Sequence, residues 1–74
     1  MTISEIKRRT QETSPYFFSK DTMRFFGQTM RSFTVEKQDD GRYMIQAPMR
    51  DSNGRHMGLT VRYFNPVNNQ LENN

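Results

Sequence analysis

Residues 1–14 are mostly polar, and their few apolar positions follow a helical spacing. Ile3 and Ile6 lie three positions apart, so they would share one face of a helix. Thr2 is suited to cap the first turn, and Glu5, three residues later, completes a capping box. The pattern therefore predicts a basic N-terminal helix or arm that can bury only a narrow apolar stripe.

A dense run of aromatic and methionine side chains follows. Eight large apolar residues fall within eighteen positions: Tyr16, Phe17, Phe18, Met23, Phe25, Phe26, Met30 and Phe33. Ser19 is a second N-cap candidate and Gly27 is a natural stop, which predicts a short aromatic helix over residues 20–26. Phe25 falls on a neighbouring face of that helix, where we expect it to be partly exposed.

Beyond this helix the apolar spacing changes to a period of two, which is typical of strands. The alternation predicts strands over residues 33–37, 43–47 and 57–64, and Pro48 is expected to end the second because it has no amide to donate. Turn signals rich in Asp, Asn and Gly separate the strands. The expected fold is therefore α+β, a three-stranded antiparallel β-meander backed by the short helix.

The alternation also assigns the two faces of this sheet. The core face is expected to hold Phe33, Val35, Tyr43, Ile45, Ala47, Leu59, Val61 and Tyr63. The outer face is expected to hold Arg42, Met44, Gln46, Thr60, Arg62 and Phe64. Residues 15–66 would form the compact domain, preceded by the basic helix or arm and followed by a mobile polar tail over residues 67–74.

Composition narrows the kinds of protein this chain can be. Its 74 residues are 32% apolar and include no cysteine, which excludes a disulfide scaffold, a cysteine zinc site and a thiol nucleophile. A chain of this length buries only about 60% of its unfolded surface, so it can build one core and no large cofactor pocket. No apolar run approaches the roughly 18 residues of a membrane span. We expect a cytoplasmic protein with no cofactor and no membrane partner.

Few side chains are suited to catalysis. His56 is the single histidine and lies beside a turn, with no acyl-transfer partner near it in the sequence. Asp39 and Asp40 are adjacent in the first turn, where short acidic residues are common for conformational reasons. We therefore expect a protein that is not an enzyme and that holds no metal ion.

Positive charge is the more informative feature. Eight of the eleven basic residues are arginines, whose planar guanidinium suits phosphate, carboxylate and aromatic partners. The candidate partner-binding residues are Lys7, Arg8 and Arg9 on the first helix, and Arg42, Arg50, Arg55, Arg62 and Phe64 on the sheet and its turns. On an exposed sheet they could stack on and neutralise single-stranded nucleic acid. They could equally be an ordinary solvated face, since a net charge of +3 is common in small domains.

A protein interface would use the same residue types differently. Arg, Tyr, Phe and Met are enriched in interface cores, and several such residues exceed what a core of this size needs. These surplus residues are Phe25, Met44, Met49 and Phe64. Clustered on the surface, they would form a partner site or the seam of a homodimer. The alternative is that they wrap the edges of the core.

One segment carries a family resemblance. The stretch from Tyr16 to Phe33 contains Phe-Phe-Ser-Lys-Asp-Thr-Met-Arg-Phe-Phe-Gly and resembles a segment of small bacteriophage accessory proteins. The similarity extends more loosely through Phe64 and leaves out the basic first helix. The resemblance implies a non-enzymatic phage protein that binds and inhibits a host protein or ribonucleoprotein assembly in the host cytoplasm, most concretely an anti-CRISPR inhibitor. The alternative function is a small basic nucleic-acid-binding module.

Overall fold

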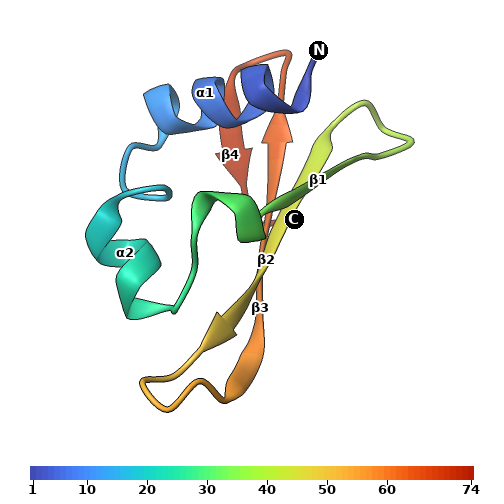
Figure 1. Ribbon diagram of the computed structural model, residues 1–74. Helices are drawn as coiled ribbons and strands as arrows, with labels where there is room; N and C mark the ends of the chain where they lie inside the picture. The colour runs from blue at the N-terminus through green and yellow to red at the C-terminus, as the bar shows by residue number, and fades with distance from the viewer.

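The computed structural model describes residues 1–74 as a four-stranded antiparallel sheet with the helices on one side (Figure 1). Its elements are α1 (Ile3–Thr13), α2 (Lys20–Phe25), the 3₁₀ turn η1 (Met30–Ser32), β1 (Thr34–Lys37), β2 (Tyr43–Arg50), β3 (His56–Asn65) and β4 (Gln70–Glu72). The strands lie in the chain order β1-β2-β3-β4. The α+β class is confirmed, with four strands instead of the expected three.

Short polar side chains set where both helices begin. Thr2 Oγ1 accepts a hydrogen bond from the backbone N–H of Glu5 at 3.1 Å, and Ser19 Oγ accepts one from the N–H of Thr22 at 3.2 Å. Each bond satisfies an amide that the first helical turn leaves without a partner. Both predicted N-caps are confirmed, and α2 ends at Phe25, one residue before its predicted end.

Pro48 does not end β2, which runs on to Arg50. β1 pairs with β2 only as far as Gln46, so beyond that residue one edge of β2 has no neighbouring strand. A residue without an N–H is tolerated on such a free edge. For this reason β2 is longer than the sequence pattern predicts.

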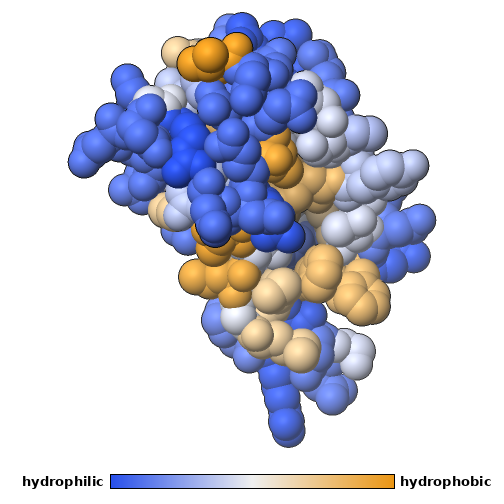
Figure 2. Space-filling model, turned by 180° about the vertical axis from the view of Figure 1, so that it is seen from behind, coloured by the Kyte–Doolittle hydropathy of each residue, from blue (hydrophilic) through white to orange (hydrophobic).

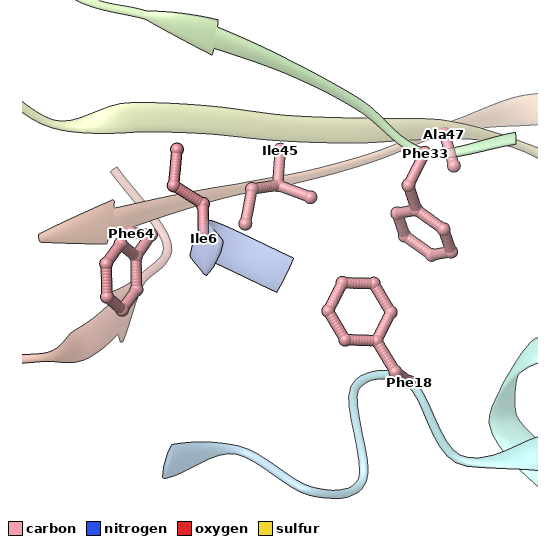
Figure 3. Packing of buried hydrophobic residues seen from close by; sticks show 6 residues of the cluster. All are labelled: Ile6, Phe18, Phe33, Ile45, Ala47 and Phe64. Carbon is pink, nitrogen blue, oxygen red and sulfur yellow. The ribbon is translucent and has the colours of Figure 1, made fainter. Parts of the chain in front are cut away.

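The core lies between the helices and the covered face of the sheet, and Figure 3 shows its buried apolar side chains. They are Ile6, Phe18, Phe33, Ile45, Ala47 and Phe64. The rings of Phe18 and Phe33 meet edge to face with centroids 4.9 Å apart. Ile6 of α1 lies between Ile45 and Phe64. Residues 1–14 therefore form part of the packed unit, and the first helix docks on the sheet.

Residues 67–74 also join the fold. β4 lies in this segment and pairs with the end of β3, where Leu71 is opposite Phe64. Leu71 is partly buried and packs against the core. The segment expected as a polar tail therefore contributes the fourth strand.

The faces of β3 are reversed relative to the sequence prediction. β3 pairs with β2 so that Ile45 lies opposite Arg62, and Tyr43 lies opposite Phe64. Directly opposed residues share a face, so Arg62 and Phe64 lie on the covered face, where Phe64 is fully buried. The expectation that both lie on the outer face is wrong. The β3 residues on the outer face are instead Leu59, Val61 and Tyr63.

The reversal has its physical cause in the pairing of β3 with β2. The alternation assigns the more apolar set, Leu59, Val61 and Tyr63, to the core, whereas Thr60, Arg62 and Phe64 include a single large apolar side chain. A shift of one residue in strand pairing moves every side chain to the other face, and the pairing with β2 selects one of the two arrangements. The set that contains Phe64 is covered, and the set that contains Leu59 faces outward.

Candidate docking surface

The outer face of the sheet is the face without helices. Its apolar side chains, which we call the outer apolar face, are Met44, Leu59, Val61 and Tyr63. Leu59 is 53% exposed, and the other three are half-buried. Figure 2 shows the molecule from behind, where hydrophobic residues gather over its middle and lower part with hydrophilic residues around them. Apolar patches with a polar rim are typical of interaction sites.

Arg42 lies at one end of the outer apolar face, beside Tyr63. Its Nε lies 2.8 Å from Oδ2 of Asp40, and its Nη1 lies 3.0 Å from Oε1 of Glu72. The guanidinium carbon also lies 4.7 Å from the centre of the Tyr63 ring, as in a cation–π contact. The Nη1 group donates further to the backbone carbonyl of Asn74. Arg42 therefore joins the first turn of the sheet to β4 and the end of the chain.

These contacts hold both carboxylates in their charged form. Hydrogen bonds from the backbone N–H and the guanidinium of Arg42 lower the pKa of Asp40. The hydrogen bond from Arg42, followed by one from Asn65, lowers the pKa of Glu72. The same two carboxylates raise the pKa of Arg42, Glu72 having the larger effect. The positive charge of Arg42 is thus balanced within the fold and does not face a partner alone.

A groove of about 590 Å³ lies between α2 and the turn that joins β2 to β3. We call it the hairpin groove, and its main lining residues are Arg24, Phe25, Phe26, Met49, Arg50 and Met57. Phe25 is 78% exposed and Met57 is 66% exposed, although both are large apolar side chains. Leu59 lines a smaller pocket together with Phe26 and Met49, so the hairpin groove adjoins one end of the outer apolar face.

The α2 wall of this groove is fixed against β2. The backbone N–H of Arg50 donates to the carbonyl of Phe26 at 2.8 Å. Gly27 has a φ of +62°, and a Cβ there would lie 3.0 Å from the Cβ of Arg50, so a side chain would force the wall away. The rings of Phe25 and Phe26 pack edge to face, 5.0 Å between centroids. The groove is therefore formed without a partner.

The basic residues of the first helix lie away from the outer apolar face. Lys7 Nζ donates to the carbonyl of Met30 at 3.0 Å. Arg8 Nη1 lies 3.6 Å from Oε1 of Glu12, in an ion pair exposed to solvent. These residues and Arg9 belong to α1, which lies on the helix side of the sheet (Figure 1).

The predicted sheet residues are also dispersed. Arg62 lies on the covered face and donates to the carbonyl of Val61 at 2.7 Å. Phe64 is in the core. Arg50 lines the hairpin groove, and Arg55 is exposed in the adjoining turn. Of these four residues, the structure therefore places only Arg50 in the lining of a candidate binding site.

The residues considered for catalysis do not converge. His56 is exposed at the start of β3, opposite Arg50, and Asp40 is engaged by Arg42. No group of three His, Asp or Glu side chains is placed to hold a metal ion. None of the helices has the length and apolar character needed to cross a membrane.

The outer apolar face could not be predicted from the sequence, because the alternation of β3 assigns Leu59, Val61 and Tyr63 to the core. The sequence does indicate that Phe25 and Met49 exceed what the core needs, and both residues line the hairpin groove. That surplus was the local signal for the site. Met57, which flanks the second turn, was not among the surplus residues.

The fold and this surface define a small α+β protein whose sheet is covered by helices on one face and carries apolar side chains on the other. The chain belongs to a family of unknown function (DUF7447), whose model matches residues 2–73. No curated protein and no solved structure matches the chain.

Proposed function

We propose that this protein is a non-enzymatic binding protein that docks on another protein through its outer apolar face. The observation that carries the proposal is that the more apolar side of β3 faces outward, with Leu59 53% exposed. Covering such a surface is favourable, by about 25 cal/mol for each Å² of apolar area removed from water. Methionine, tyrosine and arginine are also the residue types that interface cores favour.

The partner that we propose is a host protein or ribonucleoprotein assembly. The resemblance of residues 16–33 to short bacteriophage proteins supports this choice, with inhibition of a CRISPR effector complex as its most concrete form. Action by binding requires no catalytic constellation, and the exposed side chains are those of an interface.

The distribution of charge makes nucleic-acid binding the weaker candidate. A strand of nucleic acid needs a continuous basic track along which phosphates can lie. Arg42 is paired with two carboxylates, and Arg62 lies on the covered face. The remaining basic residues of the prediction are divided between α1 and the β2–β3 turn. This arrangement supports a protein partner more than a phosphate backbone.

A matched pair of lysine substitutions tests the proposal. Leu59→Lys and Val67→Lys each replace an exposed aliphatic side chain with a positive charge, but only Leu59 belongs to the outer apolar face. Affinity capture from host lysate followed by mass spectrometry should recover a stoichiometric partner with the wild type and Val67→Lys. It should recover none with Leu59→Lys, and only the wild type and Val67→Lys should suppress CRISPR interference in host cells.

Two outcomes would refute the proposal. One is the absence of any stoichiometric partner together with no effect on CRISPR interference. The other is tight binding of random-sequence DNA or RNA at about 50 mM salt that falls steeply as the salt concentration rises, which is the behaviour of phosphate contacts. Sedimentation of the purified protein identifies a homodimer directly, and a dimer that Leu59→Lys dissociates would replace the host partner with a second copy.

A further inference from the structure

We propose that the hairpin groove binds an acidic amphipathic segment of the partner protein, with apolar anchors on the groove floor and carboxylates against its arginines. This inference rests on the proposed function only in taking the partner to be a protein. It concerns a different set of residues from the outer apolar face, so the two ideas can fail separately.

The floor of the groove is apolar and comes from two distant parts of the chain. Phe25 and Phe26 lie at the end of α2, whereas Met49 and Met57 come from β2 and β3. Phe25 and Met57 remain mostly exposed, at 78% and 66%. Aromatic rings and flexible methionine side chains adapt well to apolar anchors of a bound segment. The volume of about 590 Å³ is in the range of binding sites that accept several such groups.

The groove carries more positive than negative charge. Arg24 and Arg50 both line it, and neither has a carboxylate within 4.0 Å. One nitrogen of Arg50 donates to the carbonyl of Gly54 at 3.1 Å, which leaves its other donors free. Asp51 is the one acidic residue of the lining, and its Oδ1 already accepts two backbone N–H bonds at 2.9 Å.

This pattern of charge selects an acidic ligand over a neutral or basic one. Two guanidinium groups offer planar donor pairs that match carboxylates. Asp51 forms no ion pair with either arginine, so the lining has two positive charges against one negative charge. An acidic segment with apolar residues at helical spacing would satisfy the floor and the rim together.

The position of the groove favours a segment of a larger protein over a free small molecule. Phe26 and Met49 of the groove also line a smaller pocket with Leu59 of the outer apolar face. A protein that covers Leu59 and Val61 would therefore reach the groove with the adjoining part of its chain. Because α2 is fixed against β2, binding would not have to order the wall first.

Methyl NMR of the six methionines gives a direct test, because their places in the fold differ. The probe is a synthetic peptide of about 15 residues with leucine at helical spacing and glutamate between, compared with a copy in which glutamine replaces every glutamate. We expect the acidic peptide to shift the methyl signals of Met49 and Met57. We expect no shift for Met23, which packs against the core, and a weaker effect from the glutamine copy.

Charge variants locate the recognition. Arg24→Gln and Arg50→Gln should each weaken binding of the acidic peptide about two- to fivefold, which is the size expected for exposed ion pairs. Arg8→Gln is the matched control, because Arg8 is an exposed arginine on α1, and it should leave the affinity unchanged. Phe25→Ala should weaken both peptides without changing the melting temperature, since its ring is largely exposed.

The inference is overturned if the glutamine copy binds as tightly as the acidic peptide, or if an oligouridine strand shifts Met49 and Met57 more strongly than the peptide does. It is also overturned if the acidic peptide shifts only Met44, on the outer apolar face. If Leu59→Lys abolishes partner capture while the peptide leaves all methionine signals unchanged, the proposed function stands and this inference fails. If the acidic peptide binds in the groove but no partner is captured, the proposed function fails and this inference stands.

Discussion

Replacing Phe64 with alanine should destabilise the protein far more than replacing Leu59 with alanine, because the two residues lie on opposite faces of β3. Phe64 is fully buried, whereas Leu59 is 53% exposed. The alternation of β3 taken alone predicts the reverse order, with Leu59 in the core. The comparison therefore tests the arrangement on which the outer apolar face depends.

The size of each effect follows from burial. Truncating a buried phenylalanine to alanine costs about 3–5 kcal/mol of the free energy of unfolding. Complete burial of a leucine side chain is worth about 1.5–3 kcal/mol, so truncating Leu59, which keeps less than half of its surface buried, should cost about 1 kcal/mol or less. A chain of 74 residues has a total stability of about 4–11 kcal/mol, so Phe64→Ala could leave it largely unfolded.

For that reason Phe64→Leu is measured beside the alanine variants. It should cost about 1–2 kcal/mol and leave a folded protein with a complete urea transition. Urea unfolding followed by circular dichroism should then give midpoints in the order wild type, Leu59→Ala, Phe64→Leu, with Phe64→Ala lowest or already unfolded. A midpoint for Leu59→Ala below that of Phe64→Leu would show that the faces of β3 are not as described.

Two other predictions concern the ends of the sheet and the wall of the groove. Arg42 lowers the pKa of Asp40 and Glu72, so these carboxylates contribute stability that is present above their ordinary pKa values near 4 and is lost as the pH falls through the lowered values. In Arg42→Gln the melting temperature should fall less steeply as the pH is lowered. An unchanged pH profile would contradict the stabilising role of the Arg42 ion pairs with Asp40 and Glu72. An alanine in the left-handed backbone region costs roughly 1–2 kcal/mol of the free energy of unfolding. Gly27→Ala should cost more than this, because its Cβ would also lie 3.0 Å from the Cβ of Arg50 in β2. Gly41 has open space around it, so Gly41→Ala should cost only the backbone strain. Equal losses for the two alanine variants in urea unfolding would contradict the close approach of α2.

Much of the local structure could be predicted from short-range patterns. The N-caps at Thr2 and Ser19 depend on a side chain and an amide only three residues apart, so the sequence contains all that is needed. The first turn of the sheet likewise depends on its own residues, with Gly41 at a φ of +89°. The α+β class follows from the change of apolar period after the second helix.

The fourth strand and the docking of the first helix were harder to predict. Residues 67–74 contain few apolar side chains, and β4 forms because Leu71 lies opposite Phe64 and packs on the core. Ile6 is buried because the sheet supplies an apolar surface for α1. In both cases a weak local pattern is completed by residues far away in the chain, which no short window includes.

The candidate site shows the same division. Phe25 and Met49 were recognisable as surplus apolar residues, but nothing near them in the sequence indicates that they share a groove with Arg24 and Arg50. The basic residues were predicted together as partner-binding residues, but the structure does not bring them together. Arg42 is paired with two carboxylates, one of them thirty residues away, which composition alone does not reveal.

By itself, the sequence determines where the helices begin, where the chain turns, that the molecule has one small core, and that it has no cysteine chemistry. Only the tertiary structure decides which face of β3 is covered. Each strand carries two sets of side chains, and the alternation of β3 assigns its more apolar set, which contains Leu59, to the core. The register with β2 and the helices packed on one face choose between them, and that choice leaves Leu59 and Val61 facing outward.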